Sequence, residues 1–265
     1  MKSRRYLALV AVVSLIPVPH VPLVPARITV FAAASLTEAF QDIGQEFAQR
    51  NAGIAVQFNF AGSQQLAAQL EQGAAADLFA SADQRWMTWV VERSLVEGRP
   101  RVFARNQLVV IIPRTNSARI QNLPGLARKG LKLVLAAEAV PAGKYTRDML
   151  QNLSSLPGYG EDFARRVVSN VVSNEETVRG VVAKVQLGEA DAGIVYRTDV
   201  TSDVSRFISV LEIPEAQNVV AAYPVALVRG SRHAAEAKAL LDYIVSTEGQ
   251  AILRRHGFQP VTAGP

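Results

Sequence analysis

The chain has 265 residues, contains no cysteine and carries a formal net charge of +5. The absence of cysteine excludes disulfides, thiolate nucleophiles and a cysteine-linked lipid anchor. Three of the 28 basic residues but none of the 23 acidic ones lie before Arg27, so the remainder has a net charge of +2. That balance does not favour nucleic acid as a partner, because nucleic-acid-binding proteins cluster Lys and Arg.

The first 26 residues are predicted to be a secretory signal peptide. Lys2, Arg4 and Arg5 precede an apolar run over 6–16, and small residues around Ala26 offer a cleavage point. This run is too short to cross a bilayer of about 30 Å as a helix. We therefore expect an exported, periplasmic protein.

The mature chain opens with a predicted strand over 28–34 that runs directly into a helix. Apolar side chains recur at helical spacing in Leu36, Ala39, Phe40, Ile43 and Phe47. Ser35 is the expected N-cap, and Glu38 completes a capping box with it. A helix that starts at the carboxyl end of a strand directs free N–H groups and its positive dipole end at one point, which suits an anion.

The same alternation continues in the next segment. A strand over 54–60 precedes a helix that Ser63 is expected to cap, and a short strand over 77–81 precedes a helix capped by Asp83. The side chains of Trp86 and Trp89 are expected to belong to the core. Strands that alternate with helices predict a largely parallel sheet with helices on both faces.

A second alternation begins at a strand over 108–113, and the chain then returns to finish the first unit. The predicted strands are 131–136, 167–172 and 192–196, the helices are about 144–153 and 175–187, and an extended run over 218–228 precedes helices 234–245 and 247–255. This order predicts an α/β protein of two lobes, each a mostly parallel sheet flanked by helices, joined by two extended crossover segments. Lobe I is expected to comprise 27–104 and 224–265, and lobe II 105–223. Small ligands bind in clefts of this kind.

Enzyme chemistry is poorly supported by the sequence. Of the three histidines, His20 lies in the predicted signal, while His233 and His256 lie in or beside C-terminal helices, far from Ser35 and Ser63. The spacing of His and carboxylates fits no zinc site, and no glycine-rich phosphate loop occurs. We therefore predict no catalytic residue, no metal-binding side chain and no cofactor.

Helix starts of the anion-binding type occur in both halves of the chain. Ser35 and Ser63 open helices in the first half, Ala142 lies between a strand and a helix, and Val178 lies near another helix start. Hydrogen bonds to a charged group contribute ~1.5–3 kcal/mol each, so four would supply ~6–12 kcal/mol. A micromolar site needs ~8 kcal/mol.

Several segments, in order along the mature chain, closely resemble the periplasmic molybdate-binding proteins of ABC transporters, within the type II solute-binding proteins. They are Ala32-Ala33-Ala34-Ser35-Leu36, Phe60-Ala61-Gly62-Ser63, the run 76–83, Val140-Pro141-Ala142-Gly143-Lys144-Tyr145, Thr177-Val178-Arg179-Gly180, Gly193-Ile194-Val195-Tyr196 and the run 246–253. The resemblance implies a hinged, two-lobed protein that closes on molybdate or tungstate and delivers it to a membrane permease. We expect it to act as a monomer.

Carried over residue by residue, the resemblance implies five ligand-binding positions. The hydroxyls and amides of Ser35 and Ser63, the main-chain amides of Ala142 and Val178, and the phenol of Tyr196 would hold the oxyanion. Taken singly, these residues are also two helix caps, a turn alanine, a core valine and a tyrosine at a strand end.

A site made only of donors constrains its ligand. A protonated phosphate would present a hydrogen that finds no acceptor, at a cost of ~1–3 kcal/mol. Sulfate carries no proton and could be rejected only by size, so another tetrahedral oxyanion such as sulfate is the alternative ligand. Gln64 and Gln65 stand where the family more often has small residues, which predicts a bulkier rim.

Two other classes of protein remain as competing hypotheses. A ligand-sensing regulatory domain of the same fold would need a DNA-binding or signalling segment, and the N-terminus carries a predicted signal instead. An enzyme on this scaffold, such as a porphobilinogen-deaminase-like transferase, would need a cysteine to anchor its cofactor, and the sequence has none.

Overall fold

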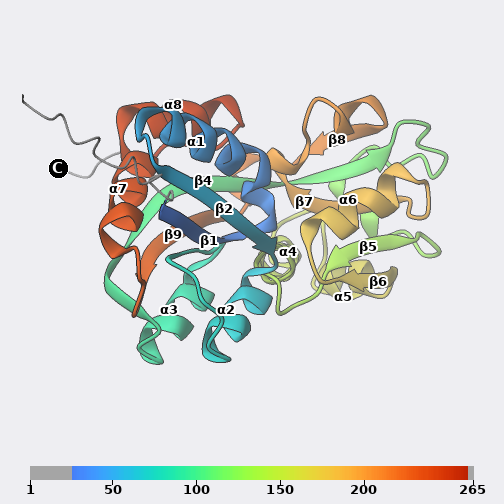
Figure 1. Ribbon diagram of the computed structural model, residues 1–265. Helices are drawn as coiled ribbons and strands as arrows, with labels where there is room; N and C mark the ends of the chain where they lie inside the picture. The colour runs from blue at the N-terminus through green and yellow to red at the C-terminus, as the bar shows by residue number, and fades with distance from the viewer. Residues whose placement is uncertain (1–25, 262–265) are drawn as a thin grey trace, which may run out of the picture.

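A computed structural model describes residues 26–261 of the chain (Figure 1). The strands in this part are β1 (Ala26–Ala33), β2 (Ile54–Ala61), β3 (Leu78–Ala80), β4 (Val96–Pro113), β5 (Leu133–Ala136), β6 (Val171–Glu175), β7 (Ala192–Tyr196), β8 (Ile208–Glu212) and β9 (Val220–Val228). The α-helices are α1 (Thr37–Arg50), α2 (Ser63–Glu71), α3 (Gln84–Glu92), α4 (Pro141–Ser154), α5 (Phe163–Val168), α6 (Val178–Gln186), α7 (Ala234–Val245) and α8 (Thr247–Arg255).

The strands form one mixed sheet in the order β2-β1-β3-β9-β4-β7-β5-β6, with β8 paired to β4. Strands β1, β2 and β3 are parallel, as are β5, β6 and β7, whereas β4 and β9 run antiparallel to their neighbours. Figure 1 shows two bodies side by side, with β4 extending from one into the other. The α/β, two-lobed fold expected from the sequence is therefore confirmed.

Strand β4 belongs to both bodies. Its first part, from Val96 to Gln107, pairs with β9, and its last part, from Leu108 to Pro113, pairs with β7 and β8. We call the part around β1, β2, β3 and β9 the first half, and the part around β5, β6, β7 and β8 the second half. The limits of the predicted lobes, 27–104 with 224–265 and 105–223, stay a prediction.

Alternation along the strands of the first half produces its two buried layers. Ile28 and Val30 pack in a cluster with α1, α7 and α8, whereas Phe31 and Phe79 pack with α2 and α3 on the other face. In the second half, α4 and α6 pack on β5 and β7. The helices thus hold the carboxyl ends of the parallel strands in fixed positions.

Two helix starts in the first half differ from the sequence prediction. Ser35 lies in a 3₁₀ turn (Ala34–Leu36), and Leu36, not Ser35, precedes α1, with no side-chain cap. The predicted capping box is therefore wrong, because the Ser35 hydroxyl pairs with Tyr223 instead. Ser63 is the first residue of α2, so the cap position belongs to Gly62, whose amide donates to Gln65 Oε1 at 3.0 Å.

The region before β6 also differs. A strand was expected over 167–172, but Phe163–Val168 forms α5 and β6 starts only at Val171. Phe163 and Val167 lie four residues apart and are both fully buried, which is the spacing of a helical face. Helix α4 begins at Pro141, three residues earlier than expected. Helix α6 begins at Val178, three residues later than expected, because Glu175 is the last residue of β6.

The predicted signal peptide lies outside the described residues, apart from Ala26, which starts β1. Between residues 26 and 261, none of the helices combines the length and apolar character needed to cross a bilayer.

Candidate ligand-binding site

A small cavity lies where the two halves meet. Its walls come from the carboxyl ends of β1, β2 and β7, from Ala82, and from the first turns of α2, α4 and α6. The lining residues are Ala33, Ala34, Ser35, Ala61, Gly62, Ser63, Ala82, Val140, Pro141, Ala142, Thr177, Val178 and Tyr196. All five positions predicted from the sequence are therefore brought together. The cavity is small, with a volume of about 10 Å³, which is close to the space that one water molecule needs.

The first half supplies two buried hydroxyls. Ser35 and Ser63 are 6% and 1% exposed, respectively. The Ser63 Oγ accepts a hydrogen bond from the Ala82 amide at 3.1 Å. This bond uses the Ser63 oxygen and not its hydrogen, so the hydrogen stays available to a ligand in the cavity.

The second half supplies backbone amides at two helix starts. Ala142 is the second residue of α4, and Val178 is the first residue of α6. Amides in a first helical turn have no intrahelical acceptor, and the helix dipole adds positive potential there. Thr177 caps α6 by accepting from the Gly180 amide at 3.3 Å, which leaves the Val178 amide for the cavity.

Gly143 allows the start of α4 to pack closely against β5 and the turn that follows it. A Cβ atom at this position would lie 2.0 Å from the Ala137 carbonyl oxygen and 2.4 Å from that of Ala136. Any larger residue would displace the first turn of α4, and with it the Ala142 amide. The Pro141-Ala142-Gly143 segment is therefore fixed in place by packing.

Tyr196 at the end of β7 carries the observation that points most directly to a ligand. Its side chain is 1% exposed, and its hydroxyl is a buried polar atom that has no hydrogen-bond partner within residues 26–261. Leaving a buried polar group unpaired costs ~1–3 kcal/mol. Burial raises the pKa of this phenol well above its ordinary value of 10.0, so it stays neutral and acts as a donor.

The cavity lining carries no Lys, Arg, His or carboxylate. The nearby cations are paired elsewhere: Lys144 contacts Asp148 at 2.5 Å, and Arg179 donates to the Ala34 carbonyl at 3.2 Å and pairs with Glu38. Among the described residues, the site therefore presents neutral donors and no charged acceptor, and this arrangement suits an anion without protons.

One carboxylate lies behind the site. Asp199 is 9% exposed, and its Oδ2 accepts from the Tyr196 amide at 2.9 Å. Burial, opposed in part by this hydrogen bond and by Arg179, raises the pKa of Asp199 from its ordinary 3.8 to about 7. Near neutral pH this carboxyl is therefore partly protonated, which reduces negative charge behind Tyr196.

Hydrogen bonds join the two halves around the cavity. The Gln64 Nε2 donates to the Glu176 carbonyl at 3.0 Å, and the Trp86 Nε1 donates to the Ala139 carbonyl at 2.8 Å. Arg179 binds the first half through Ala34 and Glu38. Gln64, which was predicted to make the rim bulkier, thus bridges the two halves. Trp86 was expected in the core, but it is half-buried and also bridges the halves.

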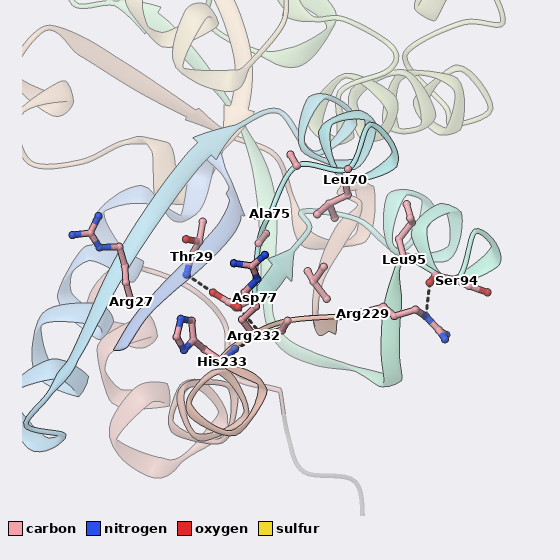
Figure 2. Close-up of a pocket in the computed structure, with 16 residues that line it drawn as sticks. Arg27, Thr29, Leu70, Ala75, Asp77, Ser94, Leu95, Arg229, Arg232 and His233 are labelled. Atoms are coloured by element: carbon pink, nitrogen blue, oxygen red, sulfur yellow. Dashed lines mark hydrogen bonds between the residues drawn. The ribbon is translucent and has the colours of Figure 1, made fainter. Parts of the chain in front are cut away.

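A larger cavity, of about 660 Å³, lies at the opposite edge of the first half (Figure 2). It is lined by groups of both signs, including Arg27, Arg232, His233 and Asp77. Asp77 already accepts from the Thr29 amide at 2.7 Å and from the Ser231 hydroxyl at 2.6 Å. The second half contributes none of its lining residues, so closure of the two halves would leave it unchanged.

Sequence reasoning missed the residues behind Ser35. Tyr223 is fully buried and its hydroxyl lies 3.0 Å from the Ser35 Oγ, while the Asn106 Nδ2 donates to the same hydroxyl at 3.3 Å. Ser35 and Tyr223 are 188 positions apart. No local pattern could have indicated this contact, because only the pairing of β9 with β3 and β4 brings Tyr223 to the cleft.

The described residues provide no cluster of metal-binding side chains. Between residues 26 and 261, no three His, Asp or Glu side chains come together in a way that could hold a metal ion. The donor set at the cavity consists of hydroxyls and amides, which bind the oxygens of an anion and are not the imidazole, thiolate or carboxylate groups that metal sites use.

Comparison with known proteins agrees with this architecture. The family model described as "Bacterial extracellular solute-binding protein" matches residues 28–259. The molybdate-binding protein ModA of Mycobacterium tuberculosis is 40% identical over 231 residues, covering 87% of this chain and 84% of the relative. This identity confirms the resemblance to molybdate-binding proteins expected from the sequence.

Two solved structures extend the comparison. The substrate-binding domain of a putative molybdenum ABC transporter from Clostridium difficile is 30% identical, with a TM-score of 0.66 and coverage of 89% of this chain and 99% of that one. The sulfate-binding protein SubI from Mycobacterium tuberculosis has a TM-score of 0.81 over 90% of this chain and 88% of its own, but only 18% identity, so that likeness shows the fold alone. By the family match over residues 28–259, the chain belongs to the bacterial extracellular solute-binding proteins, which are binding proteins and not enzymes.

Proposed function

We propose that this protein captures molybdate, and equally tungstate, in the cavity between its halves and delivers the anion to the permease of an ABC transporter. The exported chain would begin near Arg27, act in the periplasm as a monomer, and close lobe I (27–104 and 224–265) on lobe II (105–223). No resident cofactor is required, since the metal arrives as an oxyanion.

The observation that carries this proposal is the convergence of donors from distant parts of the chain on one small cavity. Ser35 and Ser63 come from the first half, and Ala142, Val178 and Tyr196 come from the second. An anion bound by both sets would stabilise the closed arrangement, because the second set is in place only when the halves meet.

The ligand type follows from the donors. A tetrahedral dianion offers four acceptor oxygens and no hydrogen, which matches hydroxyls, amides and the unpartnered Tyr196 phenol. The similarity to named molybdate-binding proteins, at 40% identity over most of both chains, supports molybdate as the member of this class.

A calorimetric titration of the chain from Arg27 onward with molybdate, tungstate, sulfate and phosphate tests the proposal. We expect molybdate and tungstate to bind with Kd of about 1 μM or tighter and to raise the melting temperature. Phosphate should not bind measurably. Binding of sulfate without binding of molybdate would assign the protein to the alternative oxyanion.

A paired variant locates the site. Ser35→Ala combined with Ser63→Ala removes two donors, each contributing ~1.5–3 kcal/mol to a charged ligand, so affinity should fall at least about 100-fold. The matched control is Ser169→Ala combined with Ser205→Ala, whose exposed hydroxyls donate to the carbonyls of Arg166 and Ser202. Equal losses in both pairs would exclude this cavity as the site.

A further inference from the structure

We infer that Tyr223, held by Asn106, is a positioning residue that donates to the Ser35 oxygen and so leaves the Ser35 hydrogen for a ligand in the cavity. This inference rests on the proposed function and explains how the Ser35 hydroxyl is kept available as a donor.

The first step is the orientation of the Asn106 amide. Its Oδ1 accepts from the Gln107 amide at 2.9 Å. Its Nδ2 donates to the Thr198 Oγ1 at 2.8 Å and to the Tyr223 hydroxyl at 3.3 Å. A backbone N–H can only donate, so the oxygen of Asn106 must face Gln107 and its NH₂ group must face Tyr223.

The second step is the direction of the hydrogen bond between Tyr223 and Ser35. The Tyr223 oxygen already accepts from Asn106, and its side chain is 0% exposed. Within residues 26–261, the acceptor in reach of its hydrogen is the Ser35 Oγ at 3.0 Å. Because an unpaired buried O–H is costly, Tyr223 donates and Ser35 accepts.

The third step follows for Ser35 itself. With its oxygen accepting from Tyr223, the remaining hydrogen of Ser35 is free to point into the cavity that this residue lines. The Ala82 amide likewise contacts the oxygen of Ser63 and leaves the Ser63 hydrogen unused. Both hydroxyls can therefore donate to a ligand.

The location of this chain of hydrogen bonds supports a role in binding. Asn106 lies on β4 and Tyr223 on β9, the two strands that pair with each other along the crossing region, where Ala104 faces Tyr223 and Asn106 faces Ala221. The direction of the Ser35 donor is thus set by groups anchored in the central strands and not by the ligand.

Tyr223→Phe tests the inference, since it removes only the hydroxyl and keeps the ring that packs on Tyr196 and Phe103. Molybdate affinity should fall about 10-fold. The loss is expected because Ser35 no longer has the contact that orients its hydroxyl. Tyr243→Phe, which removes a phenol bound to Glu46 at 3.3 Å, is the matched control and should leave the molybdate affinity unchanged.

A double-mutant cycle separates positioning from a general structural effect. In a Ser35→Ala background, Tyr223→Phe should cause no further loss of molybdate affinity, since Tyr223 acts through Ser35. An undiminished loss in that background, or an unchanged molybdate affinity in the single variant, would overturn the inference. If wild-type protein itself failed to bind molybdate, the proposed function and not this inference would be the part refuted.

A second variant covers the case in which Tyr223→Phe shows no cooperative unfolding transition. Asn106→Ala removes the donor that fixes the Tyr223 hydroxyl, so Tyr223 can then accept from Ser35 and draw the Ser35 hydrogen away from the cavity, and molybdate affinity should fall. An unchanged molybdate affinity in a folded Asn106→Ala protein would contradict the inference in the same way.

Discussion

The two sides of the cavity provide donors by different means. The first half uses side-chain hydroxyls, Ser35 and Ser63, whose oxygens are held by Tyr223 and Ala82. The second half uses the backbone at the starts of α4 and α6, together with a Tyr196 hydroxyl that has no partner in the described chain. The hydroxyl oxygens of the first side therefore have partners before a ligand arrives, whereas the Tyr196 hydroxyl of the second side has none among the described residues.

This difference has a consequence for mutagenesis. A hydroxyl can be deleted by one substitution, but a main-chain amide remains whatever side chain is chosen. The backbone donors can be changed only by displacing the helix that carries them. Variants of the second side thus report how the position of a helix start affects binding, whereas variants of the first side report the effect of removing a hydroxyl.

The largest effect is expected from Gly143→Ala. The added Cβ would lie 2.0 Å from the Ala137 carbonyl oxygen, so the first turn of α4 must move away and take the Ala142 amide with it. Molybdate affinity should fall by more than about 100-fold, equivalent to ~2.7 kcal/mol, in a calorimetric titration. Gly125→Ala is the control, because its Cβ would meet only the Asn122 side chain, at 3.3 Å. Binding retained by Gly143→Ala would show that the start of α4 contributes no donor.

Tyr196→Phe should separate affinity from stability. The variant loses a hydrogen bond to a charged ligand, so affinity should fall about 10-fold, or ~1.4 kcal/mol. The ligand-free protein should melt at the same temperature or higher, because the hydroxyl it loses has no partner among the described residues. Tyr159→Phe, which loses a bond to Gln217 at 2.8 Å, is the control and should lower the melting temperature without affecting affinity. A ligand-free Tyr196→Phe protein that melted lower would indicate a partner for this phenol in the empty site.

The carboxyl of Asp199 predicts a pH dependence of stability. Its pKa in the folded chain is about 7, above the ordinary 3.8 of the unfolded chain, so its contribution to stability is complete below 3.8 and is lost as pH rises through 7. Between about pH 6 and about pH 8, the wild-type protein should lose ~1 kcal/mol from this group. Asp199→Asn should lose less over the same interval in urea titrations. Parallel pH profiles for the two proteins would show that Asp199 ionises normally.

The smallest effect is expected from the exposed contact between the halves. Arg179 pairs with Glu38, and both side chains are more than a third exposed, so the pair contributes ~0–1 kcal/mol. Arg179→Gln should weaken molybdate binding about 2- to 3-fold. Glu38→Gln breaks the same pair but keeps the cation near the cavity. Equal losses in both variants would assign the effect to closure, and a loss in Arg179→Gln alone would assign it to the local potential.

The sequence predicted most of the fold because the helices and strands carry strong local signals. Helices over 234–245 and 247–255 were placed with the bounds that α7 and α8 have. The predicted strand over 167–172 failed because a run of valines has no local feature that separates a short buried helix from a strand. That Phe163 and Val167 lie on one buried helical face becomes evident only once their burial is known.

The resemblance to the molybdate-binding family implied the positions of Ser35, Ser63, Ala142, Val178 and Tyr196, and the structure gathers them at one cavity. That they bind a ligand stays a prediction. The roles assigned to Ser35 and Ser63 as helix caps were wrong, since their hydroxyls contact Tyr223 and the Ala82 amide. Contacts of this kind depend on how distant strands pair, and a local pattern contains no information about them.

Strand β4 has a mechanical consequence. Its 18 residues would span at most ~60 Å if fully extended at about 3.3 Å per residue, and its pairing with β9 shifts register between Glu97 and Arg101 and again between Val102 and Ala104. Irregular pairing of this kind is where a strand bends most readily. Treated as a lever pivoting near its middle, the strand converts a rotation of ~10° into a displacement of ~5 Å at either end. A bend too slight to break the central pairing would therefore suffice to separate the two walls of the cavity.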